Sequence, residues 1–388
     1  MEGTKSQSID VLVVGAGPVG LAATLFYACK GHKVVLVEHY GLTATAKRRA
    51  FNERHQQVGL NPESITFLKK YFPDLWQEVH ASSCDDGEWI TIAIFTLQNI
   101  FYKYIKAMKE VTVLFSSQVE IAHVPSPGKN ARVIVSQEDD QTGSDHIFSF
   151  YPELVVICDG KHDGSGVAKK IFDFYPASRV TLSSSGIIGM IRRYDHPGKK
   201  CLHNRSIDSY PTSIGPVHVR LLGSLQERYI ALGAGNEQVQ HAMEKLTPDK
   251  IKDILIDVFH EFRDSNEPDI TDFTEFSQRP IPIILDYRKE TIKLFDNSNT
   301  IVSIEGDAAR KTTFFSGSGL NSAWKGLEVL FTFCTKYKDL VFGSTNLLHI
   351  DEALLEKDQG SLAVSMELLK KGSKFVVAPQ CISCNLSH

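Results

Sequence analysis

The first forty residues carry the clearest hydrophobic pattern of the chain. Residues 11–14 form a continuous run of Val and Leu, which is typical of a strand buried on both faces. A glycine-rich segment, 15–20, follows, and residues 21–30 then have helical composition and end at Gly31. A second apolar run covers 33–38. The pattern predicts a β-α-β unit, which needs about thirty residues.

Similar runs recur along the rest of the chain. Helical composition predicts helices over 62–71, 97–109, 319–337, 351–356 and 361–371. Apolar runs predict strands between 111 and 135, at 154–158 and at 300–304. Between 176 and 295 strand-like segments dominate, with one predicted helix at 249–262.

These elements predict an α/β fold, in which a Rossmann-like nucleotide-binding domain carries an inserted, mostly antiparallel β-sheet substrate domain and a C-terminal helical region. The predicted divisions are 1–175 and 296–345 for the two parts of the nucleotide-binding domain, 176–295 for the substrate domain, and 346–388 for the C-terminal helical segment and tail.

Composition and charge exclude several classes of protein. Lys and Arg number 42 against 46 Asp and Glu, a net charge of −4, so no global positive field favours nucleic acid. The polar start lacks a signal-peptide pattern, and no apolar run is long enough to span a membrane. We therefore expect a cytoplasmic protein with no membrane span. The cysteines suit reduced thiols, and Cys381 with Cys384 lacks a second ligand pair, so we predict no metal.

The glycine-rich segment has the spacing of a dinucleotide-binding turn. Gly15, Gly17 and Gly20 lie between the predicted strand and helix, where glycines let backbone N–H groups approach a pyrophosphate. Glu38 ends the next strand, 18 residues after Gly20, close to the spacing of about 20 for an acid that binds a ribose hydroxyl. The pattern does not choose between NAD and FAD.

The chain resembles the FAD-dependent monooxygenases of the para-hydroxybenzoate hydroxylase fold, the class A flavoprotein monooxygenases. Three segments carry the resemblance in the family's order: the N-terminal glycine turn, residues 154–160 with Asp159-Gly160, and residues 304–321 with Gly306-Asp307. Together these segments extend from residue 11 to residue 321. The resemblance implies FAD as the cofactor and NADPH or NADH as its reductant.

The resemblance also assigns cofactor-binding residues, while it leaves the catalytic residues unknown. The resemblance implies that Asp307 binds the ribitol or ribose region of FAD and that Gln98 is a polar flavin-binding side chain. It also implies that either Arg49 or Arg54 lies near the flavin or pyrophosphate. The alternative for Arg49, Arg54 and Gln98 is an ordinary surface position. The full predicted set is Gly15, Gly17, Pro18, Gly20, Glu38, Arg49, Arg54, Gln98, Asp159, Asp307, Gly317, Gly319, Leu320 and Asn321.

Physical reasoning supports the segment 317–321 independently. A glycine-rich turn that opens a helix presents unpaired N–H groups, which can stabilise the negative charge of a reduced flavin. The alternative is an ordinary N-capped helix.

Two positions depart from the family pattern. Arg310 stands where the family usually has His, and Phe314 stands where it usually has Pro. Arg310 could still contact a reduced flavin or a substrate. After Asp159-Gly160, Lys161 and His162 could meet the phosphates of the reductant, although an ordinary loop role is favoured.

The function implied by the resemblance is hydroxylation of a small aromatic substrate with NAD(P)H and O₂. An antibiotic-inactivating oxygenase and a MICAL-like protein oxidase stay open within this class. An FAD-dependent reductase or dehydrogenase of the same fold, of the geranylgeranyl reductase type, and a non-catalytic flavin-binding protein are the alternatives. The inserted sheet supplies four polar residues that could face a ligand: Tyr210, Arg220, Arg279 and Tyr287.

Overall fold

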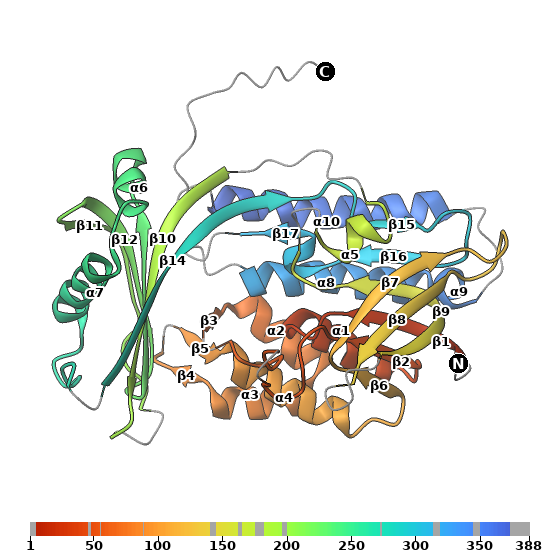
Figure 1. Ribbon diagram of the computed structural model, residues 1–388, viewed down its shortest axis with the longest axis horizontal. Helices are drawn as coiled ribbons and strands as arrows, with labels where there is room; N and C mark the ends of the chain where they lie inside the picture. Colours follow the sequence, from red (N-terminus) through yellow and green to blue (C-terminus); the bar gives the residue numbers. More distant parts are fainter. Residues whose placement is uncertain are drawn as a thin grey trace, which may run out of the picture.

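The structure is a computed structural model with two large sheets side by side (Figure 1). It describes residues 5–45, 48–54, 56–87, 89–139, 145–161, 165–174, 182–195, 200–271, 274–312, 319–343 and 350–372.

The first large sheet has eight strands among the described residues, with the order β15-β16-β9-β1-β2-β6 and with β8 and β7 continuing from β9. Its strands are β1 (Lys5–Val14), β2 (Val34–Val37), β6 (Val111–Leu114), β7 (Ser117–His123), β8 (Arg132–Glu138), β9 (Asp145–Ile157), β15 (Ile292–Leu294) and β16 (Ile301–Ile304). The five strands from β6 to β16 are parallel.

The predicted burial of 11–14 on both faces is confirmed. Val11 and Val13 pack into one core with helices, whereas Leu12 and Val14 pack into a second core on the opposite face. Because side chains alternate along a strand, only a sheet covered on both sides buries all four residues.

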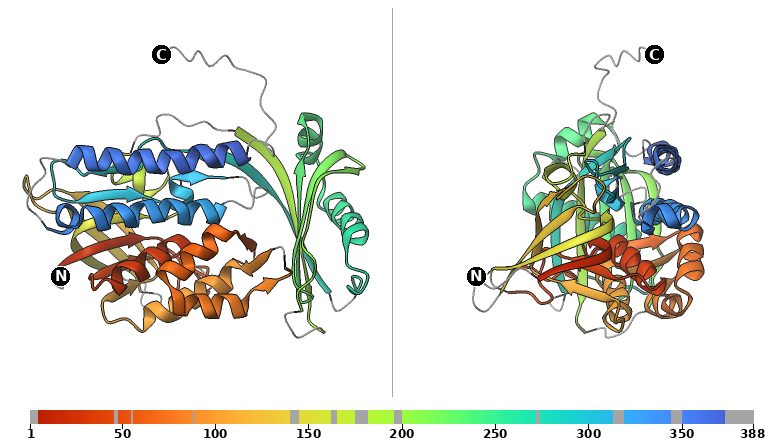
Figure 2. Two further views of the ribbon diagram at one scale, coloured as in Figure 1. Left: turned by 180° about the vertical axis from the view of Figure 1, so that it is seen from behind. Right: turned by 90° about the vertical axis from the view of Figure 1, so that its right-hand side faces the viewer.

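Helices cover the first face of this sheet. They are α1 (Pro18–Cys29), α2 (Pro62–Tyr71), α3 (Pro73–Ser82), α4 (Ile94–Lys106), α8 (Gly319–Lys336), α9 (Lys338–Phe342) and α10 (Ile350–Gly372). The long helices α8 and α10 run side by side (Figure 2). The second face carries β7, β8 and the short helix α5 (Val167–Lys170).

The second large sheet has the order β11-β12-β13-β10-β14-β17 and is antiparallel. Its strands are β10 (Leu182–Arg193), β11 (Arg205–Thr212), β12 (Gly215–Gly223), β13 (Glu227–Ala234), β14 (Thr274–Tyr287) and β17 (Arg310–Lys311). Helices α6 (Glu237–Met243) and α7 (Pro248–Phe262) cover its outer face, and the inner face is turned toward the first sheet (Figure 1).

Two small elements complete the region between the sheets. A three-stranded sheet has the order β3-β5-β4. Its strands are β3 (Gln57–Leu60), β4 (Cys84–Asp85) and β5 (Ile90–Ala93). A 3₁₀ turn, η1 (Gly306–Ala308), follows β16.

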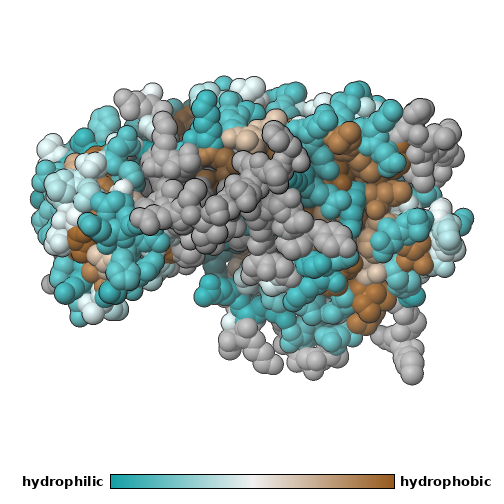
Figure 3. Space-filling model, turned by 90° about the horizontal axis from the view of Figure 1, so that it is seen from above, coloured by the Kyte–Doolittle hydropathy of each residue, from teal (hydrophilic) through white to brown (hydrophobic). Residues whose placement is uncertain are grey.

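The C-terminal helical region differs from the prediction. The two predicted helices are one helix, α10, which continues through Gly360. A Cβ at Gly360 would lie 2.8 Å from Val329, so glycine serves the close approach of α10 to α8 rather than ending a helix. The outer face of α10 exposes Leu355 and Met366, and Figure 3 shows apolar surface on this side of the molecule.

None of the helices in the described part of the chain is long and apolar enough to cross a membrane. Within the same residues, no group of three or more potential metal ligands gathers. No disulfide joins any two of the described cysteines, and burial raises the pKa of the Cys334 thiol to about 12, so this thiol stays protonated and unreactive at neutral pH.

Candidate cofactor-binding site

The turn between β1 and α1 uses its three glycines in two different ways. Gly15 has φ +102°, and a Cβ there would lie 2.6 Å from the carbonyl oxygen of Cys158. A Cβ at Gly20 would lie 1.8 Å from the carbonyl oxygen of Gly15. A Cβ at Gly17 would meet no atom within 4 Å in the part of the chain that the structure describes. Packing of the chain therefore requires Gly15 and Gly20, whereas Gly17 leaves open space in front of α1.

The start of α1 is suited to an anion. Gly17 is its N-cap, no side chain caps the helix, Pro18 opens it, and its first turn holds no acidic residue. The N–H groups of the first turn thus have no side-chain acceptor, and the helix dipole adds partial positive charge beside the open space. This end of the helix fits the pyrophosphate of a dinucleotide.

Glu38 connects β2 to the glycine turn. Its carboxylate accepts hydrogen bonds from the N–H groups of Ala16 and Tyr40, the second at 2.8 Å. The side chain is buried. Each carboxylate oxygen retains a lone pair for a further donor, so Glu38 can hold the turn and still accept from a ribose hydroxyl.

Gln98 supports the same turn from α4. Its Nε2 donates to the carbonyl oxygens of Ala16, at 2.9 Å, and Phe51, at 3.0 Å, and the side chain is buried. Its Oε1 is also buried and has no hydrogen-bond partner among the described residues. Gln98 is therefore not a surface residue, and its free oxygen can accept a bond from a group bound at the turn.

The η1 turn brings the late motif to the first one. A Cβ at Gly306, which has φ +65°, would lie 3.2 Å from the side chain of Val19 in the first turn of α1. Asp307 follows directly. The two motifs are almost 290 residues apart in sequence, and the parallel order of β1, β9 and β16 places them at the same edge of the sheet.

Asp307 is exposed at the η1 turn. Its side chain reaches solvent, yet the protein around it raises the pKa of the carboxyl group, while the positive charges of Arg54 and Lys311 lower it. The structure thus brings Arg54 near Asp307. Arg49 is exposed and has no comparable relation to Asp307, so the geometry favours Arg54 for the cofactor site.

Asp159 serves its own loop. Its carboxylate accepts from the N–H groups of Lys161, at 3.1 Å, and Val167, at 3.0 Å, and so holds the loop that leads into α5. Burial raises the pKa of this carboxyl group, and the two backbone hydrogen bonds lower it. Lys161 is exposed, and His162 lies outside the described residues.

The start of α8 contains the remaining predicted residues. Asn321 accepts from the N–H of Asn61 at 3.1 Å and from Ser64 Oγ, and it donates to the carbonyl oxygen of Gly59 at 2.9 Å. Its side chain therefore joins α8 to β3 and α2. Gly319 opens the helix and Leu320 packs partly into the core. Gly317 and Phe314 lie outside the described residues.

The expectation that Arg310 contacts flavin or substrate is wrong. Its side chain is buried in the core, where it lies 3.6 Å from Glu305 and donates to Ser361 and Ser365 of α10. Burial lowers the pKa of the guanidinium and Glu305 raises it, so Arg310 stays charged.

The inserted sheet meets the first domain through Arg220. This residue lies on the inner face of β12, 5.9 Å from the ring of Trp89, and burial lowers the pKa of its guanidinium. Trp89 in turn packs on Gly59. Trp89 could not be recognised from the sequence, because its placement depends on the neighbouring β5 hairpin rather than on a motif.

The other predicted polar residues of this sheet differ in position. Tyr210 packs against Phe262 of α7 on the outer face, with ring centres 4.9 Å apart, so it does not face the first domain as the sequence had allowed. Tyr287 is buried where β14 pairs with β17. The side chain of Arg279 lies outside the described residues.

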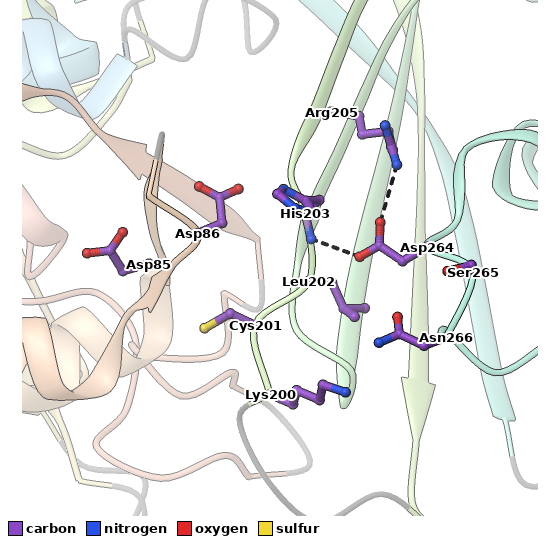
Figure 4. Close-up of a pocket in the computed structure, with 10 residues that line it drawn as sticks. All are labelled: Asp85, Asp86, Lys200, Cys201, Leu202, His203, Arg205, Asp264, Ser265 and Asn266. Atoms are coloured by element: carbon purple, nitrogen blue, oxygen red, sulfur yellow. Dashed lines mark hydrogen bonds and ion pairs between the residues drawn. The ribbon is translucent and has the colours of Figure 1, made fainter.

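A separate hollow of about 640 Å³ lies between β4 and the start of β11 (Figure 4). Asp264 accepts there from the N–H of His203 at 3.0 Å and from Arg205 at 3.3 Å. Asp86 accepts from Asn204 at 2.8 Å. The Asp86–Asn204 bond joins the loop after β4 to the segment before β11, whereas both bonds of Asp264 lie within the inserted domain. This hollow contains none of the predicted cofactor residues.

Comparison with known proteins agrees with this geometry. Residues 8–68 match a family model described as an FAD binding domain. No curated protein sequence is significantly similar to the chain.

Solved structures share the whole fold at low identity. The p-nitrophenol 4-monooxygenase PnpA from Pseudomonas putida DLL-E4 has a TM-score of 0.65 and 14% identity, covering 96% of this chain and 91% of that one. PqsL from P. aeruginosa, in complex with 2-aminobenzoylacetate, has a TM-score of 0.59 and 17% identity, covering 95% of each chain. Aklavinone-11 hydroxylase, with FAD and aklavinone, has a TM-score of 0.63 and 14% identity, covering 99% of this chain and 72% of that one. The chain therefore has the fold of the class A flavoprotein monooxygenases, and its match to the FAD-binding family model covers residues 8–68.

Proposed function

We propose that the protein is an FAD-dependent monooxygenase that hydroxylates a small aromatic compound with NADPH or NADH and O₂. One observation carries the proposal: Gly306, beside Asp307, packs on the first turn of α1, directly next to the open space left by Gly17. One extended dinucleotide can reach both places.

Each residue at this edge of the sheet has a distinct task in the proposal. Open N–H groups at the start of α1 bind the pyrophosphate, and Glu38 accepts from the ribose. Gln98 holds the glycine turn, and Asp307 with Arg54 binds the ribitol region. When bound, FAD would take a hydride from the nicotinamide and use O₂ to oxygenate the substrate.

The substrate would bind between the two large sheets. The inner face of the inserted sheet brings Arg220 against Trp89, a charged group beside an aromatic ring at the boundary between the sheets. We propose that residues 176–295 contribute the substrate side, because strands β10 to β14 form the sheet that faces the first domain. The ligands of two similar structures, 2-aminobenzoylacetate and aklavinone, support an aromatic substrate.

The glycine turn provides the sharpest test of cofactor binding. In Gly17→Ala the new methyl group meets no atom of the described residues within 4 Å, so we expect an unchanged free energy of unfolding in the absence of FAD. The methyl group fills the space needed by the pyrophosphate, and FAD affinity should fall at least about tenfold. Titration of apoprotein with FAD, followed by flavin fluorescence, measures this loss.

Gly20→Ala is the contrasting variant, because its methyl group overlaps the Gly15 carbonyl and should destabilise the fold itself. Equal FAD affinity in wild type and Gly17→Ala would contradict the proposed site.

The reaction is tested on the wild-type protein. Its absorbance spectrum should show bound flavin that bleaches on anaerobic addition of NADPH. Incorporation of oxygen from ¹⁸O₂ into an aromatic product supports a monooxygenase. Bleaching without any oxygen incorporation would instead identify a reductase of the same fold, and flavin that neither nicotinamide reduces would identify a non-catalytic binding protein.

A further inference from the structure

A buried charge network lies directly behind the Asp307 turn. Glu305 is fully buried, and its Oε1 lies 2.7 Å from Nζ of Lys357, which comes from α10. Its Oε2 lies 3.6 Å from Nη1 of Arg310. Both cations are 1% exposed. Charges removed from water this completely are retained only at a large desolvation cost, which their mutual attraction offsets.

Neighbouring helices are shaped to admit Arg310. A Cβ at Gly326, in the middle of α8, would lie 1.8 Å from Nη1 of Arg310. On the other side Ser361 and Ser365 of α10 accept hydrogen bonds from the guanidinium. Glycine inside a helix is destabilising relative to alanine. The space for Arg310 accounts for Gly326 at this position.

The network holds both ends of the η1 turn. Glu305 precedes Gly306, and its N–H donates to the carbonyl oxygen of Ile157 at 2.9 Å. Arg310 begins β17, two residues after the turn ends. Lys357 also donates to Oγ1 of Thr291 at 3.0 Å, which fixes its ammonium group. Asp307 thus lies in a short segment between Glu305 and Arg310, and both of these buried charged residues contact α10.

We propose that Lys357, Glu305 and Arg310 are positioning residues for FAD, which couple the docking of α10 to the placement of the Asp307 turn. The inference rests on the proposed function only in taking FAD as the ligand of this turn. Loss of the Lys357 charge leaves Glu305 with a single, longer ion pair, and the turn gains freedom that FAD binding must then remove.

The chain contains a matched control. Glu267 is buried with two cations as well, and lies 3.2 Å from Arg193 and 3.4 Å from Arg228. Arg193 stacks on Phe259 of α7, which places this cluster on the outer face of the inserted sheet. Its chemistry and burial match those of the Glu305 network, but it holds no residue of the cofactor site.

The experiment compares Lys357→Met with Arg228→Met. For each variant, FAD titration of apoprotein gives the dissociation constant, and urea denaturation of the same apoprotein gives the free energy of unfolding. Both variants should lose stability. Only Lys357→Met should weaken FAD binding, by about tenfold. Lys357→Arg keeps the charge and should restore affinity to within about threefold of wild type, a rescue that general loss of packing would not produce.

Ser361→Ala is the milder variant in case Lys357→Met does not fold. It removes one hydrogen bond from Arg310 and should weaken FAD binding about two- to fivefold. Unchanged FAD affinity in both Lys357→Met and Ser361→Ala overturns the inference, as does equal weakening in Arg228→Met. Wild-type protein that binds no FAD would overturn the proposed function and this inference together, whereas equal affinities overturn the inference alone.

Discussion

Two buried clusters, each of one glutamate with two cations, lie beside the two large sheets. Glu305 with Arg310 and Lys357 joins a strand end, a turn and the C-terminal helix at the edge where the cofactor motifs meet. Glu267 with two arginines joins β10, β13 and the loop after α7. A buried ion network therefore has no fixed role, because its consequence depends on which segment it holds in place.

The largest expected effect is the loss of protein stability when the glutamate of either buried cluster is neutralised. Glu305→Gln and Glu267→Gln each leave two buried cations without a carboxylate, so each should lower the free energy of unfolding by about 3 to 5 kcal/mol. Urea denaturation monitored by circular dichroism measures both. A cost below about 1 kcal/mol at either site would break the comparison, because that cluster would then not be closed to water.

A smaller effect is specific to the Glu305 network. Gly326→Ala places a methyl group on the guanidinium of Arg310 and should cost about 1 to 3 kcal/mol in free energy of unfolding. In an Arg310→Met background the shorter side chain can move aside, so the same substitution should cost much less. The double-mutant cycle measures this coupling. Equal costs in the two backgrounds would contradict the fit of Arg310 beneath α8.

Arg54 lies outside the Glu305 network and should change the pH dependence of FAD binding at the Asp307 turn. The folded-state pKa of Asp307 is raised, so its carboxylate is lost as pH falls through that raised value, and FAD binding should weaken there. Arg54→Met removes a charge that lowers this pKa, so the weakening should begin at higher pH. FAD titrations at a series of pH values measure the shift. Arg49→Met, an exposed arginine of the same segment, should match wild type.

The smallest effect is expected at an exposed cluster that also combines one glutamate with two cations. Glu367 lies 2.6 Å from Lys325 and 2.7 Å from Lys371, and these lysines lower its pKa to about 2. Its contribution is complete above the unfolded pKa and is lost as pH falls through about 2. Because water screens the cluster, Glu367→Gln should cost below about 1 kcal/mol at neutral pH. A cost as large as that of Glu305→Gln would show that burial is not what separates the clusters.

Helices α2 and α7 could be predicted from the sequence because their start signals are local. Helix α2 has the predicted bounds, and α7 begins one residue before its prediction, since each starts after a capping residue followed by proline. Prediction failed at α10, where two helices, 351–356 and 361–371, were expected in place of one helix that contains Gly360. A glycine required for close helix packing and a glycine that ends a helix look the same in one sequence.

Side-chain direction was the second limit. Alternation along β11 could not say which face carries Tyr210, because the outer helices that cover it are distant in sequence. Similarly, nothing near Arg310 indicated that Glu305 and two serines of α10 would enclose it. In both cases the surroundings of the side chain are formed by residues that are distant in sequence.

The amino-acid sequence by itself determined the β-α-β unit, the glycine turn and the order of the cofactor motifs, because these depend on backbone geometry and apolar spacing over a few residues. Tertiary structure alone decided that Gly306 lies against Val19, that Arg54 rather than Arg49 approaches Asp307, and that Lys357 supports the turn from behind. These contacts join residues far apart in the chain, and a charge acquires its role only when packing removes it from water and selects its partner.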